Sequence, residues 1–211
     1  MCSSDLGDSL AVGSGAILFA ASATPQPISF GGFGSGVTTG TSEYVITQND
    51  LAAGGVLFSS PLTSAAALTK SGPGLLKLTG ANVGLTAVRV NQGTLGVASQ
   101  SGVNGLTVTL SGGALGLLAD GNGTGGRETI VFDPINVALG SMDAGFTVDR
   151  LGMAAVGYGL TNQYAANKTI QWAGGLTGLA GQTLTFTNAN GYGLDITGAL
   201  ALPTSAVPTF N

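Results

Sequence analysis

Short runs of alternating apolar and polar residues, separated by glycine and asparagine, make up most of the chain, and they are clearest in residues 68–99. Three such runs follow one another in that segment, at 76–78, 88–90 and 95–97. Alternation with a period of two predicts strands with one apolar face. Glycine and asparagine are the residues that sharp corners between strands require. The segment is therefore predicted to run strand, turn, strand, turn, strand, without a helix.

Equivalent leucines recur at nearly equal intervals. Leu76, Leu95 and Leu115 stand at corresponding places in three successive runs of this kind. A recurrence of roughly twenty residues suits the coil of a solenoid, in which the short strands of successive coils pair at about 4.8 Å and enclose a continuous apolar column. We therefore expect an all-β fold, a right-handed parallel β-helix.

Similar runs on both sides of this segment are also expected to form strands. They lie at 8–20, as strand, turn, strand, and at 28–30, 42–47, 55–59, 106–110, 115–117, 129–132, 135–139, 146–148, 170–172, 184–186 and 194–196. The polar segment 120–128 is expected to leave the stack as a loop. Residues 152–168 are less typical of strands and are a candidate for a second loop, with Tyr158 and Tyr164 at its base. No change of composition marks a domain boundary, so 8–211 is expected to be one β-helix segment.

Segment 68–99 also carries a resemblance. Its landmarks are Ser71-Gly72, Gly74, Leu76, Leu78, Gly80-Ala81-Asn82, Val90-Asn91 and Gly93-Thr94-Leu95. This order resembles the autotransporter-associated β-strand repeat, a motif of the passenger regions of large bacterial surface and secreted proteins. The middle of the segment departs from that pattern, because Gly84 stands where an aromatic residue is usual and Thr86-Ala87 stand where glycines are usual.

The resemblance implies a structural function rather than an enzyme. The chain would be a stalk or display segment of an autotransporter-like protein, with adhesion as a further role, exported through the outer membrane to the cell surface. Its partners would be the rest of its own longer chain, stacked on both ends, and an unidentified ligand such as a glycan or the surface of a host or neighbouring cell. The chain itself would be a fragment without native caps.

The composition agrees with a repetitive, turn-rich fold. Glycine accounts for 37 of 211 residues, charged residues for 8%, and the mean hydropathy is +0.41. Such a chain is too apolar for a disordered tract and too poor in charge for a helical globule. Its six basic residues are scattered and its net charge is −4, so there is no electrostatic footprint for nucleic acid.

Residues 1–7 are set apart from the fold. The first six, Met1 to Leu6, resemble the translation of a sequencing adapter and are expected to be an artefact; an ordinary disordered N-terminus is the alternative. They include Cys2, the single cysteine of a chain that has no histidine. The sequence therefore offers no disulfide framework and no thiolate metal site.

A carbohydrate-active or glycan-binding β-helix is the alternative function. Solenoids can bring distant carboxylates together, and the densest acidic group is Asp133, Asp143 and Asp149, with Arg150 beside them. The plainer interpretation is that these acids lie in turns or face solvent. Trp172 and the tyrosines could form a sugar-binding platform, or they could pack on strands.

Residues 120–125, Asp-Gly-Asn-Gly-Thr-Gly, imitate the start of a calcium loop, but the twelfth position is Val131 instead of glutamate. A plain glycine-rich loop is the alternative. No catalytic, cofactor-binding or metal-binding residue is assigned from the sequence, and no cofactor is expected.

Overall fold

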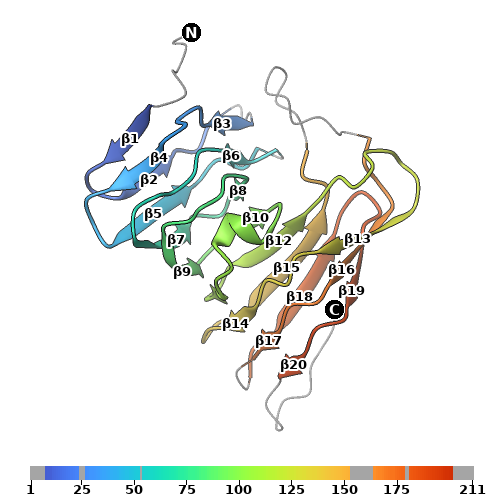
Figure 1. Cartoon of the computed structure of the whole chain (residues 1–211). Coiled ribbons are helices and arrows are strands. Elements are labelled where there is room, and N and C mark those ends of the chain that lie inside the picture. Colours follow the sequence, from blue (N-terminus) through green and yellow to red (C-terminus); the bar gives the residue numbers. More distant parts are fainter. Residues whose placement is uncertain (1–7, 24–26, 53, 153–163, 179–180, 202–211) are drawn as a thin grey trace.

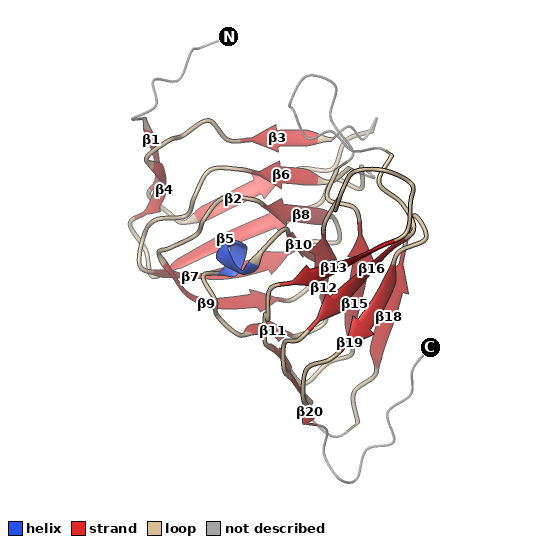
Figure 2. Ribbon diagram, turned by 45° about the vertical axis from the view of Figure 1, so that its right-hand side comes forward, coloured by secondary structure: helices blue, strands red, loops and turns tan. Residues whose placement is uncertain are grey.

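The computed structural model describes residues 8–23, 27–52, 54–152, 164–178 and 181–201, and twenty short strands account for nearly all of their regular structure. In chain order the strands are β1 (Ser9–Val12), β2 (Ala16–Phe19), β3 (Ile28–Phe30), β4 (Gly36–Thr39), β5 (Glu43–Gln48), β6 (Val56–Phe58), β7 (Ala66–Ser71), β8 (Leu75–Leu78), β9 (Leu85–Val90), β10 (Thr94–Val97), β11 (Val108–Leu110), β12 (Ala114–Leu118), β13 (Glu128–Phe132), β14 (Val137–Leu139), β15 (Ala144–Asp149), β16 (Lys168–Trp172), β17 (Leu176–Thr177), β18 (Leu184–Asn188), β19 (Gly193–Ile196) and β20 (Leu200–Ala201). One short 3-10 helix, η1 (Gln100–Val103), interrupts them and is drawn blue in Figure 2.

The strands form parallel sheets that run along the molecule. Sheet 1 has eight strands in the order β2-β5-β7-β9-β11-β14-β17-β20, and sheet 2 has seven in the order β18-β15-β12-β10-β8-β6-β3. Sheet 3 is β13-β16-β19, and β1 pairs with β4 at the other end. Figure 1 shows the coils following one another from the blue end of the chain to the red end. Because the chain visits sheet 1, sheet 2 and a third side in turn, the expected parallel β-helix is confirmed.

The register of the coils follows the spacing of the leucines. Leu95 of β10 lies between Leu76 of β8 and Leu115 of β12 in the parallel ladder, as their nearly equal intervals predict. Beyond Leu115 the coils lengthen, since its partner is Phe146, whose own next partner is Phe186. The extra residues are the segments before β13 and β16, at 119–127 and 150–167. The predicted loop at 120–128 is therefore confirmed except for Glu128, the first residue of β13.

The inward side chains form one apolar column. In sheet 1 the buried rank begins at Tyr44 and continues through aliphatic residues to Leu176, in the order Tyr44, Leu68, Val88, Val108, Val137 and Leu176. Aromatic rings join the column near its ends, where Phe30 stacks on Phe58 with ring centroids 4.8 Å apart and Phe146 contacts Trp172 with ring centroids 4.8 Å apart. Each buried aliphatic side chain contributes about 1.5–3 kcal/mol, so each coil offsets much of its own ordering entropy.

Several short elements were not predicted from the sequence. They are β4, β7, β17, β20 and η1. Strand β7 has the sequence AALTKS, whose buried residues include Lys70, so its apolar pattern is incomplete. Of the second predicted loop, the part that holds Tyr158 lies outside the described residues, as do residues 1–7.

The third side of the middle coils is closed by an asparagine instead of by a strand. The Oδ1 atom of Asn82 accepts the backbone N–H of Leu62 at 2.8 Å, and its Nδ2 donates to the carbonyl of Gly102 at 2.7 Å. Asn82 is 1% exposed, and the two residues it bonds lie twenty positions before and after it. One buried amide thus joins three successive coils, which explains the asparagine of the Gly80-Ala81-Asn82 landmark.

Replacing this asparagine should therefore weaken the stack. Asn82→Ala leaves a buried N–H and a buried carbonyl without partners, and we expect the free energy of unfolding to fall by about 2–4 kcal/mol. Urea denaturation followed by circular dichroism measures it. Asn91→Ala is the matched control, because Asn91 belongs to the same repeat and its side chain is exposed. Equal stabilities of the two variants would contradict the bridging role of Asn82.

A buried lysine stands in the apolar column. Lys70 pairs with Ile46 on one side and Val90 on the other, and it is wholly buried. Its Nζ donates to the carbonyls of Ser71, Gly72 and Gln92 at 3.0, 2.6 and 2.9 Å. The ammonium group thereby fixes the corners of two successive coils to each other, and burial lowers its pKa to about 8.

This lowered pKa predicts a pH dependence of stability. Between pH 8 and pH 10 the unfolded chain keeps the proton on Lys70 while the folded chain loses it, so the free energy of unfolding should rise with pH by about 2 kcal/mol once solvent screening is allowed for. Above pH 10 the effect of Tyr192 is opposite, since its folded pKa is raised to about 12 and the unfolded chain ionises first. Urea denaturation at several pH values between 8 and 10 tests this. Lys70→Met should lose the part of the rise that Lys70 contributes, leaving the smaller part from buried Lys77, whose pKa is also lowered. Equal slopes for the two proteins would disprove the assignment.

Candidate functional site

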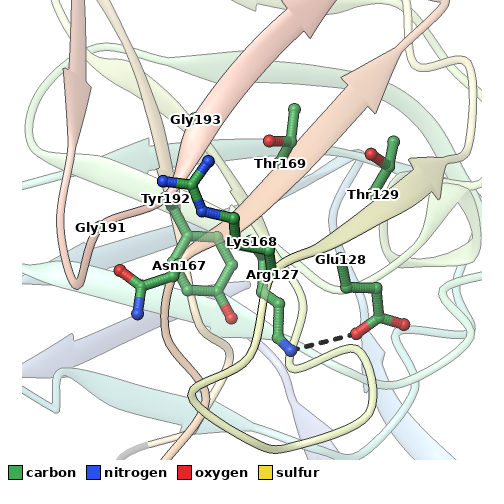
Figure 3. Close-up of a pocket in the computed structure, with 9 residues that line it drawn as sticks. All are labelled: Arg127, Glu128, Thr129, Asn167, Lys168, Thr169, Gly191, Tyr192 and Gly193. Carbon is green, nitrogen blue, oxygen red and sulfur yellow. Dashed lines mark ion pairs between the residues drawn. The ribbon is translucent and has the colours of Figure 1, made fainter.

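A group of polar side chains lies where sheet 3 begins. A hollow of about 600 Å³, called here the polar hollow, opens at this edge (Figure 3). It is lined by Arg127, Glu128, Thr129, Asn167, Lys168, Thr169, Gly191, Tyr192 and Gly193. These are three consecutive residues from each of three stacked coils.

The register of sheet 3 places these residues in ranks. Glu128 of β13 pairs with Lys168 of β16, and Thr129 pairs with Thr169, which pairs in turn with Gly193 of β19. Alternation turns Thr129 and Thr169 toward the outer face and leaves Lys168 on the buried side. The third coil supplies Gly191 and Gly193, which have no side chains, so the surface is recessed there.

Lys168 is the electrostatic centre of this corner. It is buried, and its Nζ contacts the Oε2 atom of Glu128 at 3.2 Å, the Oδ1 atom of Asn122 at 2.5 Å and the carbonyl of Gly126 at 2.7 Å. The pKa of Glu128 is lowered, mainly by the backbone N–H of Asn122 and further by the Lys168 ammonium group. The ammonium group therefore ties β16 to the loop that precedes β13.

This geometry bears on the calcium-loop interpretation of residues 120–125. The Oδ1 atom of Asp120 accepts the backbone N–H groups of Leu151 and Gly152 at 2.9 and 3.2 Å. The Oδ1 atom of Asn122 accepts the N–H of Thr124 at 3.1 Å and also faces Lys168. These oxygens are directed at N–H donors and at an ammonium group, which favours the plain glycine-rich loop. Within the described ranges, three or more acidic, cysteine or histidine residues nowhere gather as metal ligands would.

Tyr192 forms the floor of the polar hollow. It is 1% exposed, and its hydroxyl donates to the carbonyl of Ala119 at 2.7 Å. Burial raises its pKa to about 12, and the carboxylates of Asp120 and Asp149 add to the increase. The phenol is thus held neutral and serves to fasten the third coil to the corner that follows β12.

Lys77 lies on the outer face of sheet 2 and is nevertheless buried. Its Nζ donates to the carbonyl of Leu151 at 2.7 Å, so the chain after β15 reaches back to β8. Burial lowers the pKa of Lys77, and the carboxylates of Asp149 and Asp120 partly oppose this. The sequence gives no sign of this contact, because alternation alone places Lys77 in solvent.

The three aspartates that the sequence groups together do not converge. Asp143 precedes β15 and Asp149 ends it, which separates them by about 20 Å along an extended strand. Asp143 accepts the N–H of Thr183, Asp149 accepts the Nδ2 donor of Asn190, and Asp133 accepts the N–H of Gln100. The first two bonds join β15 to the next coil. The carboxylates thus link coils through hydrogen bonds. The catalytic grouping of Asp133, Asp143 and Asp149 considered from the sequence is not formed.

The aromatic residues also serve the core. Trp172 is fully buried and its Nε1 donates to the carbonyl of Ile135 at 3.0 Å. The Tyr44 hydroxyl donates to the carbonyl of Val37 at 2.8 Å inside the column. Tyr164 is exposed, and Tyr158 lies outside the described residues. Trp172 and Tyr44 thus pack as core residues, and the described aromatic side chains do not form a flat sugar-binding platform.

Comparison of the chain with protein-family models, with curated proteins and with solved structures finds no match. Over the described ranges, no helix has the length and apolar character needed to cross a membrane.

The role of Lys168 can be measured. Lys168→Met keeps the bulk of the side chain and removes the donor that three oxygens share, so we expect the free energy of unfolding to fall by about 1–3 kcal/mol. Arg89→Met, which replaces an exposed cation on sheet 1, should change it by less than about 0.5 kcal/mol.

Millimolar calcium should leave the melting temperature of the original protein unchanged. A calcium-dependent increase would show that the loop binds the metal after all.

Proposed function

We propose that this chain is a structural, surface-display segment of a large bacterial secreted or outer-membrane protein of the autotransporter type. Its role is to form part of a stiff β-helical rod that extends from the cell, and to present the outer surface of that rod for adhesion. It has no catalytic function in this proposal.

The in-register stacking of the repeat supports the proposal most directly. The landmark leucines Leu76 and Leu95 lie one above the other in sheet 2, and the landmark Asn82 bridges coils. Gly72 and Gly93 occupy corners with φ of 76° and 67°, where a side chain would be strained. Each of these landmarks is explained by coiling and stacking.

The edges and outer faces of the sheets suit a segment within a longer rod. Sheet 1 ends at β20 and sheet 2 at β18, each of which pairs on one side only among the described strands. Further coils of the same chain would pair there, as they do throughout the stack. The outer side chains include short polar ones such as the Thr147–Thr187 pair, whose hydroxyls lie 2.8 Å apart.

Surface display tests the proposal. We would place residues 8–201 between an export signal and an outer-membrane translocator in a Gram-negative host and measure antibody labelling and protease resistance on intact cells. The segment should appear at the surface as a protease-resistant fragment. Leu95→Asp, which buries a charge in the column, should make it protease-sensitive, whereas Leu18→Asp at a position 64% exposed should not.

Two results would count against the proposal. One is retention of the segment inside the cell, or protease sensitivity equal to that of Leu95→Asp. The other is release of reducing ends from polysaccharides by the purified chain, which would favour the carbohydrate-active alternative.

A further inference from the structure

We infer that the polar hollow is a binding site for a carboxylate-bearing sugar residue, such as a uronic acid. Arg127 would bind the carboxylate, and the stacked hydroxyls of Thr129 and Thr169 would bind the ring hydroxyls. This site is independent of the proposed display function, since it depends on one corner of the coil and not on how the chain is exported.

The charges in the lining select an anion. Within the lining, Lys168 and Glu128 form an ion pair. Arg127, which also lines the hollow, is exposed and has no carboxylate partner in the described part of the chain; the dashed line in Figure 3 joins Lys168 and Glu128. Because Lys168 and Glu128 neutralise each other, the lining carries one uncompensated positive charge in a chain whose net charge is −4. A guanidinium group is planar and presents paired donors, which match the two oxygens of a carboxylate.

The threonine hydroxyls of the lining can bind a hydroxylated ring, which a simple anion does not have. Thr129 and Thr169 are partners in neighbouring parallel strands, about 4.8 Å apart, and both side chains are at the outer face. Their hydroxyls form no hydrogen bond within the described residues, so each can both donate and accept. A sugar ring offers the same pair of functions at adjacent hydroxyls. The two threonines therefore suit a polyhydroxylated ring better than an apolar ligand.

The shape of the hollow comes from the glycines of the third coil. A Cβ atom added at Gly193 would meet only the Oγ1 atom of Thr169, at 3.6 Å, so the space above it is open. A volume of about 600 Å³ is within the range of small-ligand sites and exceeds the needs of one sugar ring. Lys168 and Tyr192 are fixed by hydrogen bonds to the carbonyls of Gly126 and Ala119, so both side chains have defined positions in the lining.

Binding can be tested with the full chain by NMR titration. D-galacturonate is the probe, D-galactose the neutral analogue, and inorganic phosphate an anion without a hydroxylated ring. Saturable shifts should appear at the amides of Arg127, Thr169 and Gly193 with galacturonate. Galactose and phosphate should bind at least tenfold more weakly. Phosphate binding as tight as galacturonate binding would overturn the sugar assignment and leave an anion site only.

Two variants test separately the positive charge of the hollow and its open space. Arg127→Gln should weaken galacturonate binding at least tenfold, and Arg89→Gln, on the exposed face of sheet 1, should leave it unchanged. Gly193→Val fills the hollow while keeping every charge, and valine suits a strand position, so folding should persist while binding is lost. Unchanged affinity in Arg127→Gln or Gly193→Val, with a native circular dichroism spectrum, would disprove the inference.

Discussion

Parallel backbone pairing between successive coils is the constraint on which the rest of this structure depends. A single coil contains only short strands, from the two residues of β17 to the six of β5, and could not bury its own apolar face. When coils stack at about 4.8 Å, each strand interior to sheet 1 or sheet 2 is paired on both sides and each inward side chain is covered by the one above. Side-chain identity then matters mainly through fit to the same position in the next coil, as in the rank Leu76, Leu95 and Leu115.

The same constraint determines which polar residues can be buried. Asn82, Lys70 and Lys168 are each almost fully inaccessible, and each bonds to backbone carbonyls at corners or on the third side. Corner carbonyls are not all used by the sheets, because the chain changes direction there. A long or branched polar side chain that reaches these carbonyls can form hydrogen bonds with two coils at once. These residues are therefore parts of the stack as much as the leucines are.

The repeat was predictable from the sequence, and the polar corner was only partly so. Regular spacing and alternation were enough to place Leu76, Leu95 and Leu115 in one rank. Alternation failed at β7, where Lys70 occupies an apolar position, and at Lys77, whose partner Leu151 is far away in the sequence. Residues 120–125 were recognised as an oxygen-rich loop. Their cation, Lys168, could not be identified because its distance in sequence has no fixed relation to the coil length once loops are inserted.

The polar hollow exists because segments are inserted into the otherwise regular coils. From Leu62 to Leu115, beyond the paired strands β1 and β4 of the first coils, the third side is short and is closed by Asn82 and η1. The segments before β13 and β16 lengthen the coil in two steps, and sheet 3 forms only where they occur. The next coil returns with Gly191 and Gly193 and no comparable insertion, so a hollow remains beside the projecting residues. Because Thr129 and Thr169 are partners in the register of sheet 3, their relative positions are fixed by the backbone, which would lower the entropic cost of binding the ligand proposed above.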